Sequence, residues 1–232
     1  MPRRAVLLLP AVLLALAASG CGGDGDGESD ATTTATQAET ETETTGAAAG
    51  CRDVEAPDPR EDGGGTQPTE PLDPSKTWTL TFATSCGDFV VTLDVDGAPE
   101  TAASLVALAE DGFYDDTVFH RIVPGFVIQG GDPTQSGSGG PGYQTVDAPP
   151  SDAAYVKGVM AMAKTATDPA GSSGSQFFVV TGADIGLPPD YAIVGEVTDG
   201  LDVVELIGAL GDPQTEQPLQ PVVIESVTAS SS

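Results

Sequence analysis

Basic residues are scarce in this sequence. Lysine and arginine together number 8 against 35 aspartates and glutamates, which gives the 232-residue chain a formal net charge of -27. Nucleic acids and anionic membrane surfaces are bound through basic patches, so this balance argues against both as direct partners of the folded chain. The excess of acidic residues is otherwise typical of a well-solvated surface.

Large apolar residues are nearly absent between residues 22 and 75. Residues 22–50 consist mainly of Gly, Asp, Glu, Thr and Ala, and residues 57–74 are rich in proline and glycine. Such segments bury too little apolar surface to offset the entropy of ordering the chain. We therefore expect a disordered tether over 22–75 and a single folded domain over 76–229, which is long enough to bury a core.

The N-terminal apolar run, residues 6–16, is too short to span a bilayer, which needs about 20 residues. Arg3 and Arg4 before it and small residues after it are typical of a secretion signal over 1–21. The ending ALAASGC resembles a bacterial lipoprotein signal. That resemblance implies lipid on Cys21 and an extracytoplasmic protein that only this lipid attaches to the cell membrane. The alternative is a plain secretory signal and a secreted protein.

The chain has only three cysteines. If Cys21 carries lipid, Cys51 and Cys86 remain, and an isolated pair outside the cytoplasm indicates a disulfide. The bond would close a loop of about 35 residues and fix the tether to the start of the domain. A reactive thiol pair or a metal site is the alternative, but the sequence has no histidine near either cysteine.

Alternating and helical patterns indicate about eight short strands and two helices after residue 76. The strands are expected at residues 77–84, 89–95, 119–123, 126–128, 155–162, 176–181, 191–197 and 222–228. One helix is expected from Pro99 until just before Gly112, and another over 200–208. This spacing predicts a mainly β domain, an antiparallel β-barrel that is closed to remove its edges, with helices over its ends.

The stretch from 119 to 132 is the strongest candidate for a functional site. It contains the only histidine, an arginine, two phenylalanines and a glutamine, and a Pro-Gly turn divides it into two strands. Strict alternation would put Phe119, Arg121 and Val123 on one face. A permanently charged guanidinium beside aromatic rings and an amide suggests a site more than a core. The glycine-rich residues 137–142 lack the lysine and the following helix of a phosphate-binding loop.

Three motifs resemble the cyclophilin family of peptidyl-prolyl cis-trans isomerases. They are FHRIVPGFVIQGGDP at 119–133, GSSGSQFFV at 171–179 and YAIVGEV at 191–197. The resemblance extends in order over about residues 76–229. It implies a closed eight-stranded antiparallel β-barrel capped by two α-helices, with the binding pocket on the outside of the barrel.

The resemblance also implies which residues take part in catalysis and substrate binding. It assigns Arg121 and Gln129 to catalysis. The substrate-binding positions that it implies are Phe126, Val127, Ala163, Lys164, Gln176, Phe178, Leu187 and Tyr191. Three positions depart from the better-known members, because Lys164 replaces an asparagine, Tyr191 replaces a histidine, and Gly186 stands where many relatives have tryptophan.

The expected function is therefore prolyl isomerisation in exported proteins, with proline-containing polypeptides as partners and a monomeric enzyme. Rotation about the X-Pro bond makes and breaks no covalent bond, so we expect no metal and no cofactor. The alternative is a proline-binding module or chaperone on the same fold with little turnover. A cell-surface adhesion or solute-binding lipoprotein has no support in the sequence beyond the anchor.

Overall fold

The computed structural model describes residues 50–232, all of which lie in one compact unit. The predicted signal, the predicted lipid site at Cys21 and the first part of the predicted tether lie outside these residues.

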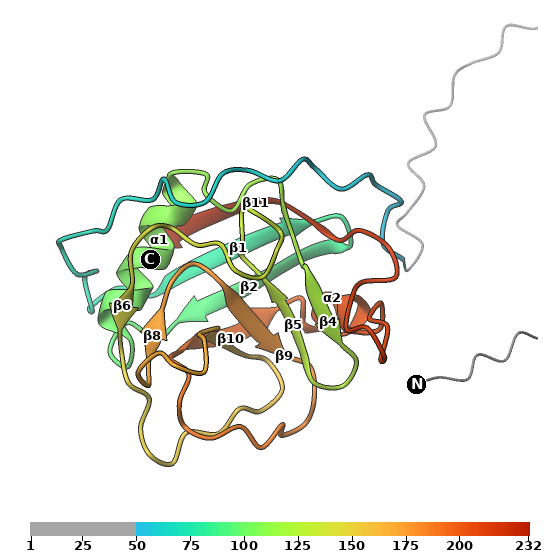
Figure 1. Ribbon diagram of the computed structural model, residues 1–232. Coiled ribbons are helices and arrows are strands. Elements are labelled where there is room, and N and C mark those ends of the chain that lie inside the picture. The colour runs from blue at the N-terminus through green and yellow to red at the C-terminus, as the bar shows by residue number, and fades with distance from the viewer. Residues whose placement is uncertain (1–49) are drawn as a thin grey trace, which may run out of the picture. The chain divides into compact units, whose positions relative to one another are not determined.

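The described chain contains eleven strands and two helices, which Figure 1 shows. The strands are β1 (Trp78–Thr84), β2 (Gly87–Leu93), β3 (Thr117–Val118), β4 (Arg121–Val123), β5 (Val127–Gly130), β6 (Thr145–Val146), β7 (Val159–Met162), β8 (Ser172–Ser173), β9 (Phe177–Val180), β10 (Ile193–Asp199) and β11 (Val223–Ser231). The helices are α1 (Pro99–Glu110) and α2 (Leu201–Gly208). The mainly β class and the two helices agree with the sequence-based expectation.

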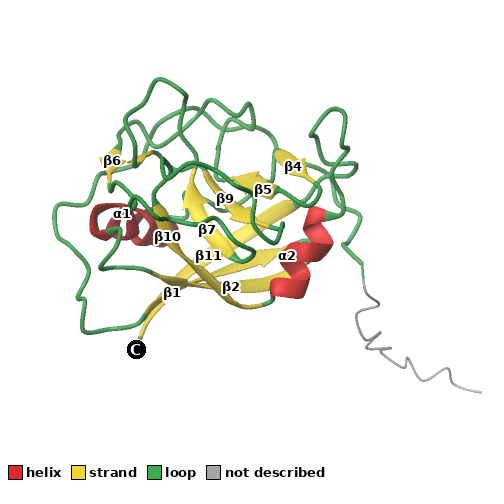
Figure 2. Cartoon of the chain, turned by 90° about the horizontal axis from the view of Figure 1, so that it is seen from below, coloured by secondary structure: helices red, strands yellow, loops and turns green. Residues whose placement is uncertain are grey.

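Nine strands form one antiparallel sheet in the order β3-β11-β1-β2-β10-β7-β9-β5-β4, and β6 pairs with β8 separately. The sheet curls strongly, with the helices at its two ends (Figure 2). The prediction of a closed eight-stranded barrel is wrong, because the sheet is a half-barrel whose edge strands β3 and β4 do not pair. The backbone amide of Phe119 donates to the carbonyl of Val222, which continues the pairing of β3 with β11. The backbone amide of Ile122 in β4 donates to the carbonyl of Glu216, which lies in a loop and not in a strand.

The core lies inside the curl of the sheet. Residues Phe82 and Phe89 face each other across β1 and β2, and their rings stack with centroids 4.7 Å apart. The hairpin forms as the alternating pattern predicts, since every second residue is buried from Leu80 onward in β1 and from Phe89 onward in β2. Helix α1 has Pro99 in its first turn and Gly112 with φ 67° just beyond its end, as expected for its N- and C-terminal stops.

Over residues 50–232, neither helix has the length and apolarity to cross a bilayer. Helix α1 has 12 residues and α2 has 8, and both place apolar side chains against the core.

The strand predicted over 119–123 is interrupted. Phe119 and Ile122 are both fully buried in the core, although strict alternation would put them on opposite faces. Residues 119 and 120 connect β3 to β4 and belong to neither strand, which shifts the pattern by one position. Arg121 therefore shares a face with Val123, as expected, but not with Phe119.

Residues 51–75, which we call the strap, follow the surface of the domain without helix or strand, and Figure 1 shows this segment in blue. The predicted disulfide between Cys51 and Cys86 is present. Further along, Arg60 N donates to Pro133 O at 2.8 Å, and Gly63 N donates to Gly140 O at 2.9 Å. This part of the tether, which we expected to be disordered, is held by a covalent bond and backbone hydrogen bonds, neither of which needs an apolar pattern.

Candidate active site

A pocket of about 310 Å³ lies on the outer face of strands β4, β5, β7 and β9. The structure brings together nine of the ten residues predicted for catalysis and substrate binding. They are Arg121, Phe126, Val127, Gln129, Ala163, Lys164, Phe178, Leu187 and Tyr191. The tenth, Gln176, lies beside the pocket and bonds to Gln129. Gly186 is not among the residues that line it.

Strand alternation supplies the apolar side of this pocket. Along β9, Phe177 and Val179 enter the main core, whereas Phe178 belongs to a second apolar cluster on the opposite face. Ala161 of β7 and Val127 of β5 enter the same second cluster. Both faces of these strands are thus apolar, one for the core and one for the pocket, which agrees with the expected position of the pocket outside the barrel.

Cross-strand register sets Arg121 beside the apolar surface. Arg121 is paired with Gln129 across β4 and β5, and Gln129 is paired with Phe178 across β5 and β9. Paired residues of an antiparallel sheet project from the same face. The guanidinium, the amide and the phenylalanine ring therefore form one row.

The turn between β4 and β5 places Phe126 at the mouth of the pocket. Phe126 N donates to Val123 O at 3.0 Å across Pro124 and Gly125, and Gly125 has φ 69°. This is the geometry of a type II turn, which requires a positive φ at its third residue and so favours glycine. The ring of Phe126 stays half-buried at the edge of the second apolar cluster.

A chain of polar side chains holds Arg121 in place. Its Nη1 donates to Gln129 Oε1 at 3.3 Å, and its Nε donates to Glu216 Oε2 at 2.7 Å. Gln129 Nε2 donates to Gln176 Oε1 at 3.1 Å, and Gln176 Nε2 donates to Gly139 O at 2.9 Å. Each amide therefore has a fixed orientation, and Gln129 contacts Arg121 directly.

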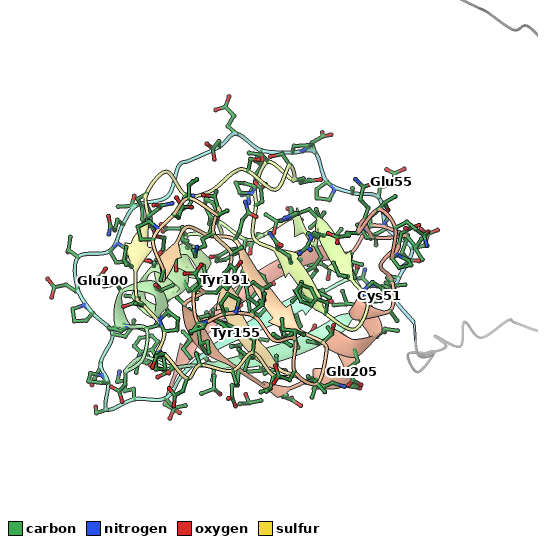
Figure 3. The ribbon with its side chains drawn as sticks, turned by 60° about the horizontal axis from the view of Figure 1, so that its bottom comes forward. Cys51, Glu55, Glu100, Tyr155, Tyr191 and Glu205 are labelled. Carbon is green, nitrogen blue, oxygen red and sulfur yellow. A yellow bond between two sulfur atoms is a disulfide. The ribbon has the colours of Figure 1, made fainter. Side chains whose placement is uncertain are left out.

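Tyr191 and Phe178, which both line the pocket, pack with the buried Tyr155, and Figure 3 shows Tyr155 and Tyr191 close together. The ring of Tyr191 packs edge-on against both Tyr155 and Phe178, with centroids 6.0 Å and 5.6 Å apart. The hydroxyl of Tyr155 donates to Tyr191 O at 2.7 Å and accepts from Tyr191 N at 3.0 Å. Burial raises the pKa of Tyr155, so this hydroxyl keeps its proton and fixes the backbone of Tyr191.

Lys164 lines the pocket, but its ammonium group is already engaged. The Nζ atom lies 2.7 Å from Asp190 Oδ2, donates to Asp168 O at 3.1 Å, and sits 5.5 Å from the centre of the Tyr191 ring. Only 4% of the side chain is exposed. Lys164 thus connects the loops that carry Asp168 and Asp190, while it remains among the residues that line the pocket.

The glycine-rich residues 137–142 line a larger neighbouring groove of about 630 Å³. The backbone amides of Gly137, Ser138 and Gly139 all donate to Asp132 Oδ2. Burial would raise the pKa of Asp132, but hydrogen bonds from Thr134, Gly139 and Gly137 outweigh it and lower that pKa. The carboxylate of Asp132 thus occupies backbone amides that a phosphate-binding loop would use to bind phosphate. This agrees with the sequence-based conclusion that residues 137–142 are not such a loop.

His120 lies under this loop and away from the pocket. Within residues 50–232, neither ring nitrogen has a hydrogen-bond partner although both are buried. Burial lowers the pKa of His120, and the neighbouring Arg121 adds to this effect while Asp132 opposes it. The imidazole is therefore neutral at pH 7.

The sequence gives no sign of Glu216, the residue that binds the Nε of Arg121. It lies 95 positions further along the chain in an acidic, proline-containing loop that resembles many exposed loops. Its positive φ of 59° is also not readable from the residue type.

Comparisons with known proteins agree with this geometry. The family model described as cyclophilin type peptidyl-prolyl cis-trans isomerase/CLD matches residues 79–229. Peptidyl-prolyl cis-trans isomerase A of Mycobacterium tuberculosis is 39% identical over 175 residues, covering 68% of this chain and 94% of the relative. Peptidyl-prolyl cis-trans isomerase B of Streptomyces anulatus is 38% identical over 166 residues, covering 63% of this chain and 93% of the relative.

A solved structure is similar as well. It is a cyclophilin type peptidyl-prolyl cis-trans isomerase of Cryptosporidium parvum in the presence of the dipeptide Ala-Pro, and it superposes with a TM-score of 0.61 at 28% identity. The match covers 66% of this chain and 99% of that one.

The fold, the pocket and these relatives define a class of enzyme that accelerates rotation about peptidyl-prolyl bonds. The chain belongs to the cyclophilin-type peptidyl-prolyl cis-trans isomerase family.

Proposed function

We propose that this enzyme isomerises X-Pro bonds in exported polypeptides, with Arg121 as the catalytic donor and the apolar pocket as the site of the proline ring. The observation that carries the proposal is the position of Arg121, which is held by two side chains in the same row as Phe178 on the outer face of the sheet. A peptide can reach this face without entering the core.

The chemistry of the bond explains why a guanidinium suits this position. Resonance gives the C–N bond partial double-bond character and a rotation barrier of about 18–20 kcal/mol. In the twisted transition state the nitrogen regains a lone pair, so a fixed cationic donor binds that state better than either planar isomer. Arginine keeps its charge and has several N–H groups, and two of them can position the group while others face the substrate.

The substrate side of the proposal follows from the pocket. Phe126, Val127, Phe178 and Leu187 offer an apolar surface for the five-membered ring, and Gln129 orients the guanidinium. The related enzyme from Cryptosporidium parvum was solved in the presence of Ala-Pro, which supports proline peptides as the ligands here.

A protease-coupled assay on a proline-containing tetrapeptide tests the catalytic role. We expect the wild type to accelerate isomerisation and Arg121→Ala to lose at least about tenfold in kcat/KM, with an unchanged fold by circular dichroism. Arg121→Lys should recover only a small part, because a lysine lacks the second donor arm. Peptide binding without acceleration in the wild type would favour a binding module or chaperone instead.

The cellular setting is a further part of the proposal. We infer that the enzyme acts outside the cytoplasm as a monomer, attached to the membrane by lipid on Cys21. The disulfide between Cys51 and Cys86 supports an oxidising compartment, since cytosolic thiols are kept reduced. Metabolic labelling with a fatty-acid probe should mark the wild type and not Cys21→Ala. Absence of label on the wild type would leave secretion as the setting.

A further inference from the structure

We infer that Glu216 is the positioning residue of this active site, and that it acts by holding the guanidinium of Arg121 in one orientation. The inference rests on the proposed role of Arg121 and goes beyond it, because Glu216 itself lines no part of the pocket. Its Oε2 accepts a hydrogen bond from Arg121 Nε at 2.7 Å.

The backbone of Glu216 is fixed to the strand that carries Arg121. The carbonyl of Glu216 accepts from Ile122 N at 2.9 Å, one residue beyond Arg121. The amide of Glu216 donates to Asp212 O at 2.8 Å. The carboxylate of Glu216 is therefore in register with Arg121 through bonds that do not involve either side chain.

The loop around Glu216 is itself braced. Asp212 Oδ1 accepts from the backbone amides of Gln214 and Thr215 at 2.8 and 2.9 Å, and these bonds lower the pKa of Asp212. The ends of the loop meet in an antiparallel bridge between Gly211 and Pro218. Glu216 is therefore part of a turn that hydrogen bonds hold in one conformation.

The contact with Glu216 uses one N–H group of the Arg121 guanidinium and leaves others for the substrate. Glu216 accepts the hydrogen bond from Arg121 Nε, and Gln129 accepts one hydrogen bond from Arg121 Nη1. Within residues 50–232, no group accepts a hydrogen bond from Arg121 Nη2. Two contacts on different nitrogens fix the plane of the group. The remaining N–H groups are then oriented before substrate arrives, which is how a preorganised donor lowers a barrier.

A second ion pair of nearly equal exposure provides the control. Lys157 Nζ and Glu205 Oε1 lie 2.6 Å apart, with side chains 39% and 49% exposed, against 33% and 47% for Arg121 and Glu216. Neither Lys157 nor Glu205 lines the pocket. An effect of Glu216 that merely reflects the loss of a surface ion pair should thus also appear at Glu205.

The experiment measures kcat and KM on the proline tetrapeptide for Glu216→Ala, Glu216→Gly, Glu216→Gln and Glu205→Ala. We expect both truncations to lower kcat about tenfold with KM within twofold. Glu216→Gln keeps an acceptor for Nε and should stay within threefold of wild type, and Glu205→Ala should match wild type. Glycine adopts the φ of 59° without strain, so Glu216→Gly should keep its melting temperature and separates activity from stability.

A double-variant cycle decides whether Glu216 acts through Arg121. In an Arg121→Ala background, Glu216→Gly should have no further effect on kcat. An equal loss in both backgrounds, an unchanged kcat in Glu216→Gly, or a Gln variant as impaired as Gly would each overturn the inference while a working wild type left the proposed function standing. A wild type without turnover would instead overturn the proposed function.

Discussion

Removal of the disulfide between Cys51 and Cys86 tests how the strap is attached. The bond joins residues 35 positions apart. In the chain-entropy model a loop of this length stabilises the folded state by about 4 kcal/mol at 25 °C, because it restricts the unfolded chain. We therefore expect the double variant Cys51→Ser/Cys86→Ser to lose about 3–4 kcal/mol of unfolding free energy, or roughly 8–15 °C in melting temperature.

This magnitude assumes that the strap stays on the surface when the bond is gone. Noncovalent contacts that would keep it there include the ion pair of Arg52 with Glu225 and the bonds from Arg60 to Pro133 and from Gly65 to Pro141. If the strap left the surface instead, the folded variant would gain much of the same chain entropy, and the measured loss would shrink.

Urea unfolding followed by tryptophan fluorescence provides the measurement, since Trp78 lies at the start of β1. Wild type treated with a reductant should match the double variant, which controls for the serine side chains. The isomerase activity of the variant at 10 °C should stay within twofold of wild type, since neither cysteine lines the pocket. A loss below about 1 kcal/mol would refute the view that noncovalent contacts suffice to hold the strap.

Two further predictions concern the pocket and the buried histidine. Phe126→Ala should raise KM about five- to thirtyfold, because a half-buried ring contributes about 1–2 kcal/mol of apolar contact; an unchanged KM would remove Phe126 from the pocket. His120 has a lowered pKa in the folded protein, so the unfolded chain binds the proton first and stability is lost as pH falls below the ordinary value of 6.5. Urea unfolding at pH 7.0 and 5.5 should show that His120→Phe lessens this loss, whereas parallel pH profiles of the two proteins would contradict it.

The sequence was sufficient to predict elements whose structure follows from the pattern of neighbouring residues. Leu80 and Phe82 alternate with threonines, and Phe89 and Val91 continue the pattern after a short turn, so the hairpin and its buried face could be predicted. Most of the pocket residues could be predicted because they stand in long motifs, and the register of β5 and β9 places Gln129 beside Phe178.

Other features depend on contacts that leave no pattern in the chain. The outer side of β4 bonds to a loop, since the amide of Ile122 donates to the carbonyl of Glu216, 94 residues further along the chain. The strap is held partly by the side chains of Arg60 and Asp62 and by glycine amides, which have no apolar period. Glu216 becomes recognisable only when its loop is placed against β4.

The open sheet also has a consequence for how this protein meets other chains. Its two edge strands are only two and three residues long, and the outward amide of Ile122 in β4 is occupied by the carbonyl of Glu216. An extended polypeptide therefore finds few free backbone N–H and C=O groups at these edges with which it could pair as a further strand. We therefore expect a client to bind on the outer face of the sheet and not by adding a strand, and neighbouring copies have little exposed edge at which to associate.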